Sequence, residues 1–587
     1  MLLTRKDVIE LLEEIAVWLE IKGENVFKIR AYTNGARALQ MLEGDVVELI
    51  LSGEIGKIKG FGKALVEKLT EFATTGKLEY LETLRAEFPE SLLEVMKVPN
   101  VGPKKIQRFY NELEITSIDE LIAACEDGRI AAMSGMGAKT AEKIIDSVER
   151  MRTNAAFFLF PAARAAAEAV AEELRGLRQI KRLEIAGSLR RYKTHTKDAD
   201  IIASTDDPDA VMAHFVGLPI VDVVQEQGQT KSSILVKGGM QVDLRLVGDD
   251  VFPFALHHFT GSKDHNVAMR SRAIRMGMKV SEWGLFKTDG DEETLIPCSD
   301  EASLFEALGL HYIPPELRED LGEIEFAESE ECPRLVSESD YRGVLHCHTH
   351  ASDGSDSIED LIAHAHGLGH RYLGITDHSK SSFQANGLDE ERLLGQIGKI
   401  EAARKSLPKG FTLFSGVECD IRVDGELDYE DEILEQLDFV IVSVHSAFTQ
   451  SREDMTKRVV KAIEHPSACI LAHPTGRVLL QREAYAIDLH TVIDAAAANN
   501  VAIEFNCNPL RLDMDWTLWH KARDKGVVCS INPDAHRLSN FDFIELGIGF
   551  CRKGWLAPDD ILNCWDAKKV EKFFKARKQT SKPSAAE

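Results

Sequence analysis

The spacing of apolar residues divides the chain into three stretches. Up to about residue 150, apolar side chains recur at helical intervals between glycine turns, as in VIELLEEIAVWLEI and ALVEKLTEFA. From about residue 180 the pattern changes to short apolar runs bounded by Gly, Asp and Lys, such as KRLEIAG, DADIIAS and QVDLRLV, which predicts strands. Beyond residue 339, strand and helix patterns alternate to about residue 570. We therefore expect an all-α region, an α+β region and a βα region.

Composition narrows the class of protein. A chain of 587 residues is too long for one core and suggests roughly three to five domains. No apolar run approaches the ~20 residues that cross a bilayer, and the N-terminus lacks a signal-peptide pattern. The ten cysteines form no CxxC pair and lie mostly in apolar runs, which predicts buried, reduced thiols. A cytoplasmic monomer without membrane contact is expected.

The formal net charge of −26 argues at first against a nucleic-acid partner, because binding to a polyanion depends on Lys and Arg. Part of this acidity is local, however, in the stretch from Glu316 to Glu331. The charge therefore predicts weak, salt-sensitive non-specific DNA binding rather than none.

One glycine motif occurs three times, as IKGFGKAL (58–65), VPNVGPKKI (98–106) and MSGMGAKTA (133–141). Each copy places glycines before a helix that begins with lysine, the helix-hairpin-helix pattern that binds the DNA backbone without reading bases. Three ordinary glycine caps are the alternative, which the recurrence disfavours. The predicted DNA-binding residues are Gly60, Gly62, Lys63, Gly102, Lys104, Lys105, Gly135, Gly137 and Lys139.

A first chemical site is predicted around three aspartates. Asp198 and Asp200 occupy alternate positions of one expected strand and so share a face, and Asp243 lies on a later strand. Carboxylates gathered on one face repel one another unless cations lie between them, and two Mg²⁺ (or Mn²⁺) about 3.5–4 Å apart would satisfy them. An isolated DxD is more often an exposed strand end. Here, however, it follows the turn G187-S188-L189-R190-R191, which could bind a triphosphate.

This GSxRR and DxD spacing resembles the family X DNA polymerases, and H258-F259-T260-G261-S262 resembles that family's thumb motif. The resemblance implies a palm with Asp198, Asp200 and Asp243 as catalytic metal ligands. It also implies nucleotide or template contacts at Gly187, Ser188, Arg191, His258, Phe259, Gly261, Ser262, Asn266 and Arg270. His258 stands where the animal enzymes have tyrosine, and Lys263 where they have an acid.

The N-terminal helices resemble the same family's lyase domain, which places Lys68 at the Schiff-base position and Lys28 at a phosphate-binding position. Ala64 stands where a helper lysine is expected. A solvated helix lysine is the default interpretation of Lys68, and lyase chemistry is the alternative.

A second chemical site is predicted where successive apolar runs end in metal-binding side chains, as in GVLHCH, RYLGITDH and FVIVSVH. Ligands at strand ends are how a βα barrel builds a site at one rim. Six histidines and three carboxylates exceed one tetrahedral zinc site and fit two or three ions, with Mn²⁺, Zn²⁺ or Fe²⁺ favoured by imidazole. The predicted ligands are His346, His348, Asp353, His378, Glu418, His445, His473, Asp534 and His536.

These motifs resemble the PHP (polymerase and histidinol phosphatase) domain over residues 340 to about 570. The resemblance implies a distorted (β/α)7 barrel and, behind a family X polymerase, a metal-dependent 3′–5′ exonuclease that could also process blocked or abasic ends. The predicted domains are a lyase-like helical domain (1–85), helix-hairpin-helix fingers (86–150), a palm (151–248), a thumb (249–318), an acidic linker (319–338), the barrel (339–572) and a basic tail (573–587).

We therefore expect a bacterial, nucleoid-associated base-excision repair polymerase that fills gapped or nicked DNA with dNTPs and trims 3′ ends. Two alternatives stay open. One is a DNA-binding end-processing nuclease with an inactive palm. The other is a small-molecule phosphatase like histidinol phosphatase.

Overall fold

The computed structural model describes residues 5–40, 46–58, 60–89, 91–99, 101–290, 292–330 and 333–579. Its contacts divide the chain into two compact units, Met1–Ala156 and Phe157–Glu587. No helix among the described residues is long and apolar enough to cross a lipid bilayer. In the same ranges, nine cysteines are buried free thiols, as predicted, and Cys332 lies outside them.

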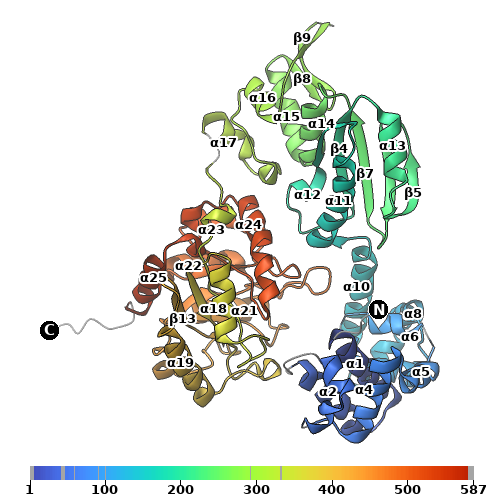
Figure 1. Cartoon of the computed structure of the whole chain (residues 1–587), viewed down its shortest axis with the longest axis vertical. Coiled ribbons are helices and arrows are strands. Elements are labelled where there is room, and N and C mark those ends of the chain that lie inside the picture. Colours follow the sequence, from blue (N-terminus) through green and yellow to red (C-terminus); the bar gives the residue numbers. More distant parts are fainter. Residues whose placement is uncertain are drawn as a thin grey trace, which may run out of the picture. The chain divides into compact units, whose positions relative to one another are not determined.

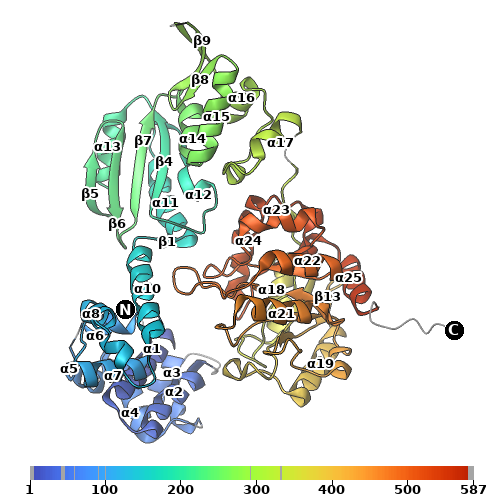
Figure 2. The ribbon, with the colours of Figure 1, turned by 180° about the vertical axis from the view of Figure 1, so that it is seen from behind.

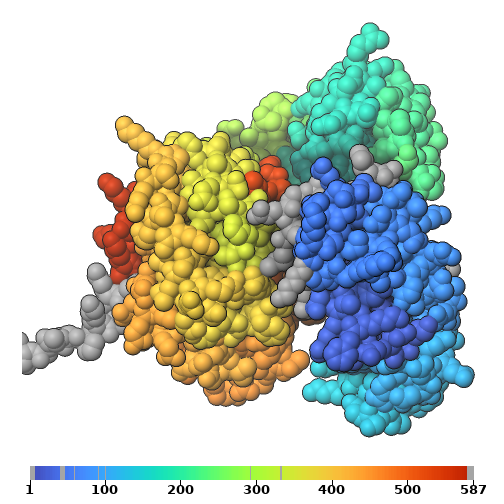
Figure 3. Space-filling model, turned by 60° about the horizontal axis from the view of Figure 1, so that its bottom comes forward, coloured from blue at the N-terminus to red at the C-terminus, as the bar shows by residue number. Residues whose placement is uncertain are grey.

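The first unit is entirely helical where it is described, as the apolar spacing predicts. Its helices turn apolar faces toward one core, for example Leu65 and Leu69 of α4 and Ile144 and Val148 of α10. Figure 3 shows its atoms, in blue, as one closely packed body. The helices are α1 (Arg5–Lys22), α2 (Val26–Gln40), α3 (Val46–Leu51), α4 (Lys63–Thr75), α5 (Glu79–Ala86), α6 (Leu92–Met96), α7 (Pro103–Leu113), α8 (Ile118–Glu126), α9 (Arg129–Ala132) and α10 (Ala138–Asn154).

The second unit begins with the palm, a five-stranded sheet of order β2-β4-β7-β6-β5. Strands β4 and β7 are parallel, and the other neighbouring pairs are antiparallel. Helices α11 and α13 lie against one face of the sheet (Figures 1 and 2). The elements are β1 (Phe158–Leu159), α11 (Phe160–Arg175), β2 (Ile180–Ile185), α12 (Gly187–Arg190), β3 (His195–Thr196), β4 (Asp198–Thr205), α13 (Pro208–Val216), β5 (Val221–Gln227), β6 (Lys231–Val236) and β7 (Gln241–Val247).

The thumb follows as α14 (Phe252–Thr260), α15 (Lys263–Arg275), a small antiparallel sheet and α16 (Glu301–Ala307). The sheet's strands are β8 (Met278–Ser281), β9 (Gly284–Asp289) and β10 (Glu292–Ile296). The acidic stretch predicted as a linker from 319 is folded up to residue 330. It contains α17 (Glu323–Ser329), with Glu323 fully buried and hydrogen-bonded to His265 (2.7 Å). Its acids are partners for buried cations, which local composition could not show.

The last part is the predicted barrel, built from two parallel sheets, β11-β12-β13 and β14-β15-β16-β17-β18. Parallel bridges His378–Glu418 and Cys347–Ala535 join the sheets at both junctions and close the ring. Only two residues separate β13 from β14, so together they form one bent strand of a seven-stranded barrel. The strands are β11 (Gly343–Val344), β12 (Tyr372–Ile375), β13 (Thr412–Ser415), β14 (Glu418–Asp420), β15 (Val440–Ser443), β16 (Ala468–Leu471), β17 (Ala502–Asn506) and β18 (Cys529–Asn532).

Helices surround these strands (Figure 1). They are α18 (Ile358–Gly367), α19 (Glu390–Arg404), α20 (Asp431–Leu434), α21 (Arg452–Glu464), α22 (Leu489–Asn499), α23 (Trp516–Asp524), α24 (Phe543–Lys553) and α25 (Ala567–Gln579). The predicted basic tail begins inside α25, where Phe574 and Arg577 are buried, and its last residues, from 580, lie outside the described ranges.

Two candidate metal sites and their surroundings

The three palm aspartates lie together on one face of the sheet. Asp200 on β4 is directly opposite Asp243 on β7, and Asp198 lies two residues earlier on the same strand face. The alternate residues of β4, Ala199 and Ile201, point into the core. The parallel pairing of β4 with β7 therefore brings together all three carboxylates that the sequence singled out.

Burial and repulsion from neighbouring carboxylates raise the affinity of Asp198 and Asp200 for protons. Burial, followed by the charges of Asp198 and Asp243, raises the pKa of Asp200 to about 6. Burial and Asp243 also raise the pKa of Asp198. The Lys231 ammonium lies 3.5 Å from Asp243 Oδ2. A site with this excess of negative charge is suited to divalent cations.

The turn after β2 fits closely against Asp200. Gly187 has φ 60°, and a Cβ there would lie 2.3 Å from Asp200 Oδ2, so glycine is required by both conformation and space. The backbone N–H of Ala186 donates to Asp200 O (2.8 Å). The Ser188 hydroxyl lies 2.7 Å from Thr196 Oγ1, and the Thr196 hydroxyl donates to Asp198 O (2.8 Å).

Both arginines of this turn are held by acids of the thumb region. Arg190 pairs with Glu301 (2.7 Å). Arg191 donates through Nε to Glu319 (3.1 Å) and through a terminal nitrogen to Thr260 O (2.6 Å), and its side chain is 12% exposed. Arg191 is therefore held beside the aspartates by protein partners, a restraint that the sequence did not reveal.

The predicted thumb contacts follow one another at the α14–α15 junction. His258 is half-buried beside Phe259, and burial lowers its pKa. The Phe259 ring stacks under the Arg245 guanidinium, 4.3 Å from the ring centroid. Arg245 shares the sheet face of Asp243 on β7, so this contact ties the motif to the palm.

Asn266 and Ser262 make hydrogen bonds that fix the end of the thumb motif (258–262). The Asn266 amide donates to His258 O (2.7 Å), and its buried Oδ1 has no hydrogen-bond partner among the described residues. A Cβ on Gly261 would lie 2.6 Å from that Oδ1. Ser262 caps α15 by accepting from His265 N (3.0 Å), and Arg270 is exposed.

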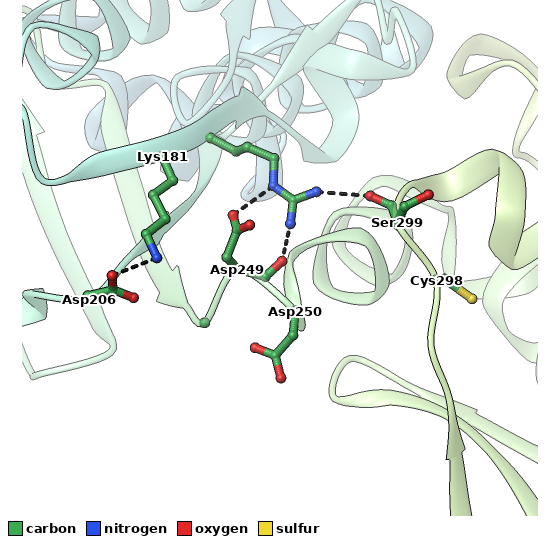
Figure 4. Close-up of a pocket in the computed structure, with 8 residues that line it drawn as sticks. Lys181, Asp206, Asp249, Asp250, Cys298 and Ser299 are labelled. Atoms are coloured by element: carbon green, nitrogen blue, oxygen red, sulfur yellow. Dashed lines mark hydrogen bonds and ion pairs between the residues drawn. The ribbon is translucent and has the colours of Figure 1, made fainter.

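A cavity of about 750 Å³ lies at the opposite end of β4 from Asp198. Its two cations are paired with protein groups: Lys181 with Asp206 (2.6 Å), and Arg182 with Asp249 (2.8 Å) and Ser299 O (3.1 Å) (Figure 4). Because these cations are already neutralised, this cavity is not a competing triphosphate site.

The predicted barrel ligands gather around Glu418 at the strand ends. Its Oε2 lies 2.9 Å from His378 Nδ1 and 3.4 Å from His346 Nε2. Its Oε1 lies 2.9 Å from His473 Nε2 and 3.2 Å from His445 Nε2. Three groups have ligand atoms within 4.8 Å of one another: His348, Asp353, His378 and His536; His346, His348, Glu418 and Asp534; His378, Glu418 and His445.

These donors fit divalent ions. Five buried atoms of the cluster have no hydrogen-bond partner among the described residues: His346 Nε2, His348 Nδ1, His378 Nδ1, Glu418 Oε2 and His473 Nδ1. Two of these nitrogens, His346 Nε2 and His378 Nδ1, lie within 3.4 Å of Glu418 Oε2 without the geometry of a hydrogen bond. Buried polar atoms rarely lack partners, and shared imidazole and carboxylate donors are the usual ligands of Zn²⁺, Mn²⁺ and Fe²⁺.

The barrel site contains its own counter-charges. Burial opposes ionisation of Glu418, but His378 and His445 outweigh it and hold the pKa of this carboxyl well below its usual value. Burial likewise opposes charge on His445, yet Glu418 and Asp420 raise its pKa to about 9. Carboxylate and imidazole thus stabilise one another inside the barrel.

Two acids behind the ligands were missed by sequence reasoning. Glu504 accepts from His346 Nδ1 (2.6 Å), and Asp420 lies 3.2 Å from His445 Nδ1. Partners of this kind fix the tautomer and orientation of a metal-binding imidazole. The available signal was a fully buried charged residue inside an apolar strand, as in AIEFN of β17.

The predicted DNA-binding glycines lie at helix starts. Gly62, Gly102 and Gly137 are the N-caps of α4, α7 and α10, and Gly60 and Gly135 have φ of 108° and 75°. The lysines of these helix starts are exposed or half-exposed: Lys63, whose side chain is 91% exposed, and Lys104, Lys105 and Lys139. Each turn therefore presents backbone N–H groups next to a cation.

Lys68, the candidate lyase residue, packs its ammonium over the Tyr80 ring, 4.6 Å from the centroid. Lys28 lies over the same ring (5.8 Å) and pairs with Glu24 (3.1 Å). The structure therefore brings the two predicted lyase-domain lysines to one aromatic ring.

Known protein families match successive parts of the chain, in the order of the domains described above. Residues 4–78 match the model of a helix-hairpin-helix domain, 92–150 that of a SAM-like helix-hairpin-helix tandem, 255–319 that of the DNA polymerase beta thumb and 345–508 that of the PHP domain. The chain is 37% identical over 574 residues to the DNA polymerase/3′-5′ exonuclease PolX of Bacillus subtilis (strain 168), covering 97% of this chain and 99% of that protein. It is also 26% identical over 243 residues to a probable phosphatase of Thermoanaerobacter sp. (strain X514), covering 38% of this chain and 96% of that protein.

Proposed function

We propose that this chain, which belongs to the family X DNA polymerases with a C-terminal PHP domain, fills short gaps during DNA repair and carries a separate 3′–5′ exonuclease site in its barrel. The observation that carries the proposal is the meeting of Asp198, Asp200 and Asp243 on one sheet face, beside the turn that starts at Gly187. Gapped or nicked DNA and dNTPs would be its substrates. It would act as a monomer on DNA of the bacterial nucleoid.

In the palm, the three aspartates would hold Mg²⁺ or Mn²⁺. Bound ions would supply positive charge that activates the primer hydroxyl and neutralises the departing pyrophosphate. Ser188 and Arg191 would bind the triphosphate, with Phe259 and Gly261 beside the sugar. By the family resemblance, Asn266 would contact the base and Arg270 the template strand.

In the barrel, the nine clustered histidines and carboxylates would hold two or three ions of Mn²⁺, Zn²⁺ or Fe²⁺. Bound ions would supply Lewis-acid charge for hydrolysis of the terminal phosphodiester. Glu504 and Asp420 would hold His346 and His445 in the orientation that binds metal.

A primer-extension assay on a gapped duplex separates the two activities. Asp198→Ala with Asp200→Ala should stop dNTP incorporation and leave 3′ trimming, whereas His346→Ala should do the reverse. Wild-type protein that incorporates no dNTP with Mg²⁺ or Mn²⁺ would contradict the polymerase assignment. Faster hydrolysis of histidinol phosphate than of 3′-ended DNA would instead identify the barrel as a small-molecule phosphatase.

Lyase chemistry at Lys68 is a separate proposal, supported by the position of Lys68 and Lys28 over one tyrosine ring. Borohydride should trap a covalent adduct between the protein and a 5′-deoxyribose phosphate end, and Lys68→Ala should remove it. Lys77→Ala, on the same unit, is the control. Equal trapping in both variants would exclude Lys68 as the nucleophile.

A further inference from the structure

The nucleotide-binding turn of the palm is in direct contact with helix α24 of the barrel. Tyr192, which follows Arg191, stacks on Phe160 of α11 with ring centroids 5.0 Å apart. The same ring meets Phe550 of α24 edge-on at 5.6 Å, and Phe160 meets Phe550 at 5.5 Å. One aromatic cluster therefore contains two rings of the palm and one ring of the barrel.

The backbone of α24 approaches Tyr192 as closely as a glycine permits. A Cβ on Gly549 would lie 2.0 Å from Tyr192 Cε1, which no ordinary contact allows. Tyr192 itself has φ 54°, a left-handed conformation that a bulky residue keeps only where its surroundings hold it. The packing of α24 thus supports the conformation of the turn.

A charge cluster forms a second connection between the same two parts. Glu319 accepts from Arg191 Nε (3.1 Å) and from Lys553 Nζ of α24 (2.6 Å), and lies 3.2 Å from Lys193 Nζ. The Lys553 side chain is fully buried over the Trp516 ring, 4.1 Å from the centroid. Burial lowers the pKa of Lys553 to about 8, with Glu319 opposing this shift.

Sharing one carboxylate among three cations leaves positive charge at the turn. If Glu319 paired with Arg191 alone, it would neutralise the guanidinium, and Arg191 would attract a second anion less strongly. Because Lys553 also binds Glu319, the negative charge of this carboxylate is shared between the two cations. The barrel lysine therefore keeps part of the charge of Arg191 available to a phosphate.

We propose that helix α24 of the barrel is a positioning element of the polymerase site, which holds the turn 187–192 ready for the triphosphate of the incoming nucleotide. Gly549, Phe550 and Lys553 are the positioning residues. This inference rests on the proposed role of Ser188 and Arg191 in binding the triphosphate. It gives the barrel a function in synthesis that does not depend on its metal ligands.

Two glycines of α24 provide a matched test in the full-length protein. Gly549→Ala pushes against Tyr192, whereas Gly547→Ala pushes against Cys507 Sγ (2.2 Å from the added Cβ) inside the barrel. Alanine strengthens a helix at either position. Gly549→Ala should raise the KM for dNTP by about 10- to 100-fold while the exonuclease rate stays normal. Gly547→Ala should leave the KM for dNTP unchanged and lower the exonuclease rate.

The charge contact is tested separately with Lys553→Met. It should raise the KM for dNTP about threefold to tenfold, with kcat less affected, because Glu319 then neutralises Arg191 more completely. Lys569→Met is the control, since Lys569 also lies over a tryptophan, Trp565 (3.7 Å), but on α25. Unfolding temperature and exonuclease rate report whether each variant is folded.

The outcomes separate this inference from the function on which it rests. If Arg191→Ala raises the KM for dNTP but Gly549→Ala and Lys553→Met do not, α24 has no positioning role. If Arg191→Ala leaves that KM unchanged, the proposed triphosphate contact fails and the inference fails with it. If Gly549→Ala prevents folding, the result with Lys553→Met decides.

Discussion

The palm and the barrel gather acidic side chains under opposite electrostatic conditions. In the palm, Asp200 faces Asp243 across two parallel strands, and mutual repulsion with burial raises the pKa of Asp200. In the barrel, Glu418 is surrounded by imidazoles, which lower its pKa. The palm site has negative charge that its own residues do not compensate, whereas histidines of the barrel site offset much of its negative charge.

This difference predicts how each site acquires its ions. A carboxylate set suits Mg²⁺, which proteins bind through few ligands together with substrate phosphates. An imidazole-rich set encloses its ions through protein ligands alone and favours transition metals. The palm ions should therefore exchange with the buffer and arrive with nucleotide, while the barrel ions should remain bound through purification.

The largest expected effect comes from Glu418→Gln, which removes the acid that five imidazoles share. The exonuclease rate should fall by more than the roughly 100-fold typical for loss of an outer partner. Bound metal, measured by elemental analysis, should fall with it, while dNTP incorporation stays normal. Glu426→Gln, an exposed acid paired with Lys461, is the control. A full metal complement in Glu418→Gln would contradict the central role of this carboxylate.

A smaller effect is expected from Asp420→Asn, behind His445. The asparagine cannot neutralise this imidazole, so the affinity of the barrel for metal should fall about 10- to 100-fold. Asp428→Asn is the matched control, because Asp428 accepts a hydrogen bond from the backbone N–H of Ser381 (2.7 Å) and is not paired with His445. Metal titration of the stripped proteins gives the comparison, and equal losses in both variants would assign Asp420 a purely structural role.

The smallest effect is a pH dependence of the palm. A carboxyl whose pKa is raised holds its proton below that pKa, so protons compete with cations for Asp200 as the pH falls through about 6. The Mg²⁺ concentration for half-maximal incorporation should rise up to about tenfold per pH unit below this point, while the rate at saturating Mg²⁺ changes less. A constant Mg²⁺ requirement between pH 7 and 5 would show that Asp200 is ionised throughout.

The residues at strand ends were the most predictable part of both sites. Each predicted barrel ligand except Asp353 follows an apolar run, and the alternation of Asp198 and Asp200 fixed a shared face, so local pattern sufficed for their placement. Their roles as ligands stay predictions, as do the domain boundaries and the nucleotide contacts. Glu504 was missed because it lies inside a strand, where its function depends on a histidine about 160 residues away in sequence.

The acidic stretch after residue 318 was misjudged for a related reason. Local composition indicated a linker, yet Glu319 is bound by Arg191 from the palm and Lys553 from the barrel. Partners this distant in sequence leave no periodic pattern. The contact between Tyr192 and Gly549 was equally hidden, since neither residue belongs to a chemical motif.

Closure of the barrel also determines the order in which the two sites can form while the chain is being synthesised. Cys347, which follows the first strand, pairs with Ala535 near the last strand, so about 190 residues must be synthesised between the two halves of the ring. At ordinary rates of chain elongation this interval lasts on the order of 10–40 s, during which the palm has already emerged. A nascent or prematurely terminated chain would thus contain the three palm aspartates proposed for nucleotide addition before its barrel could close.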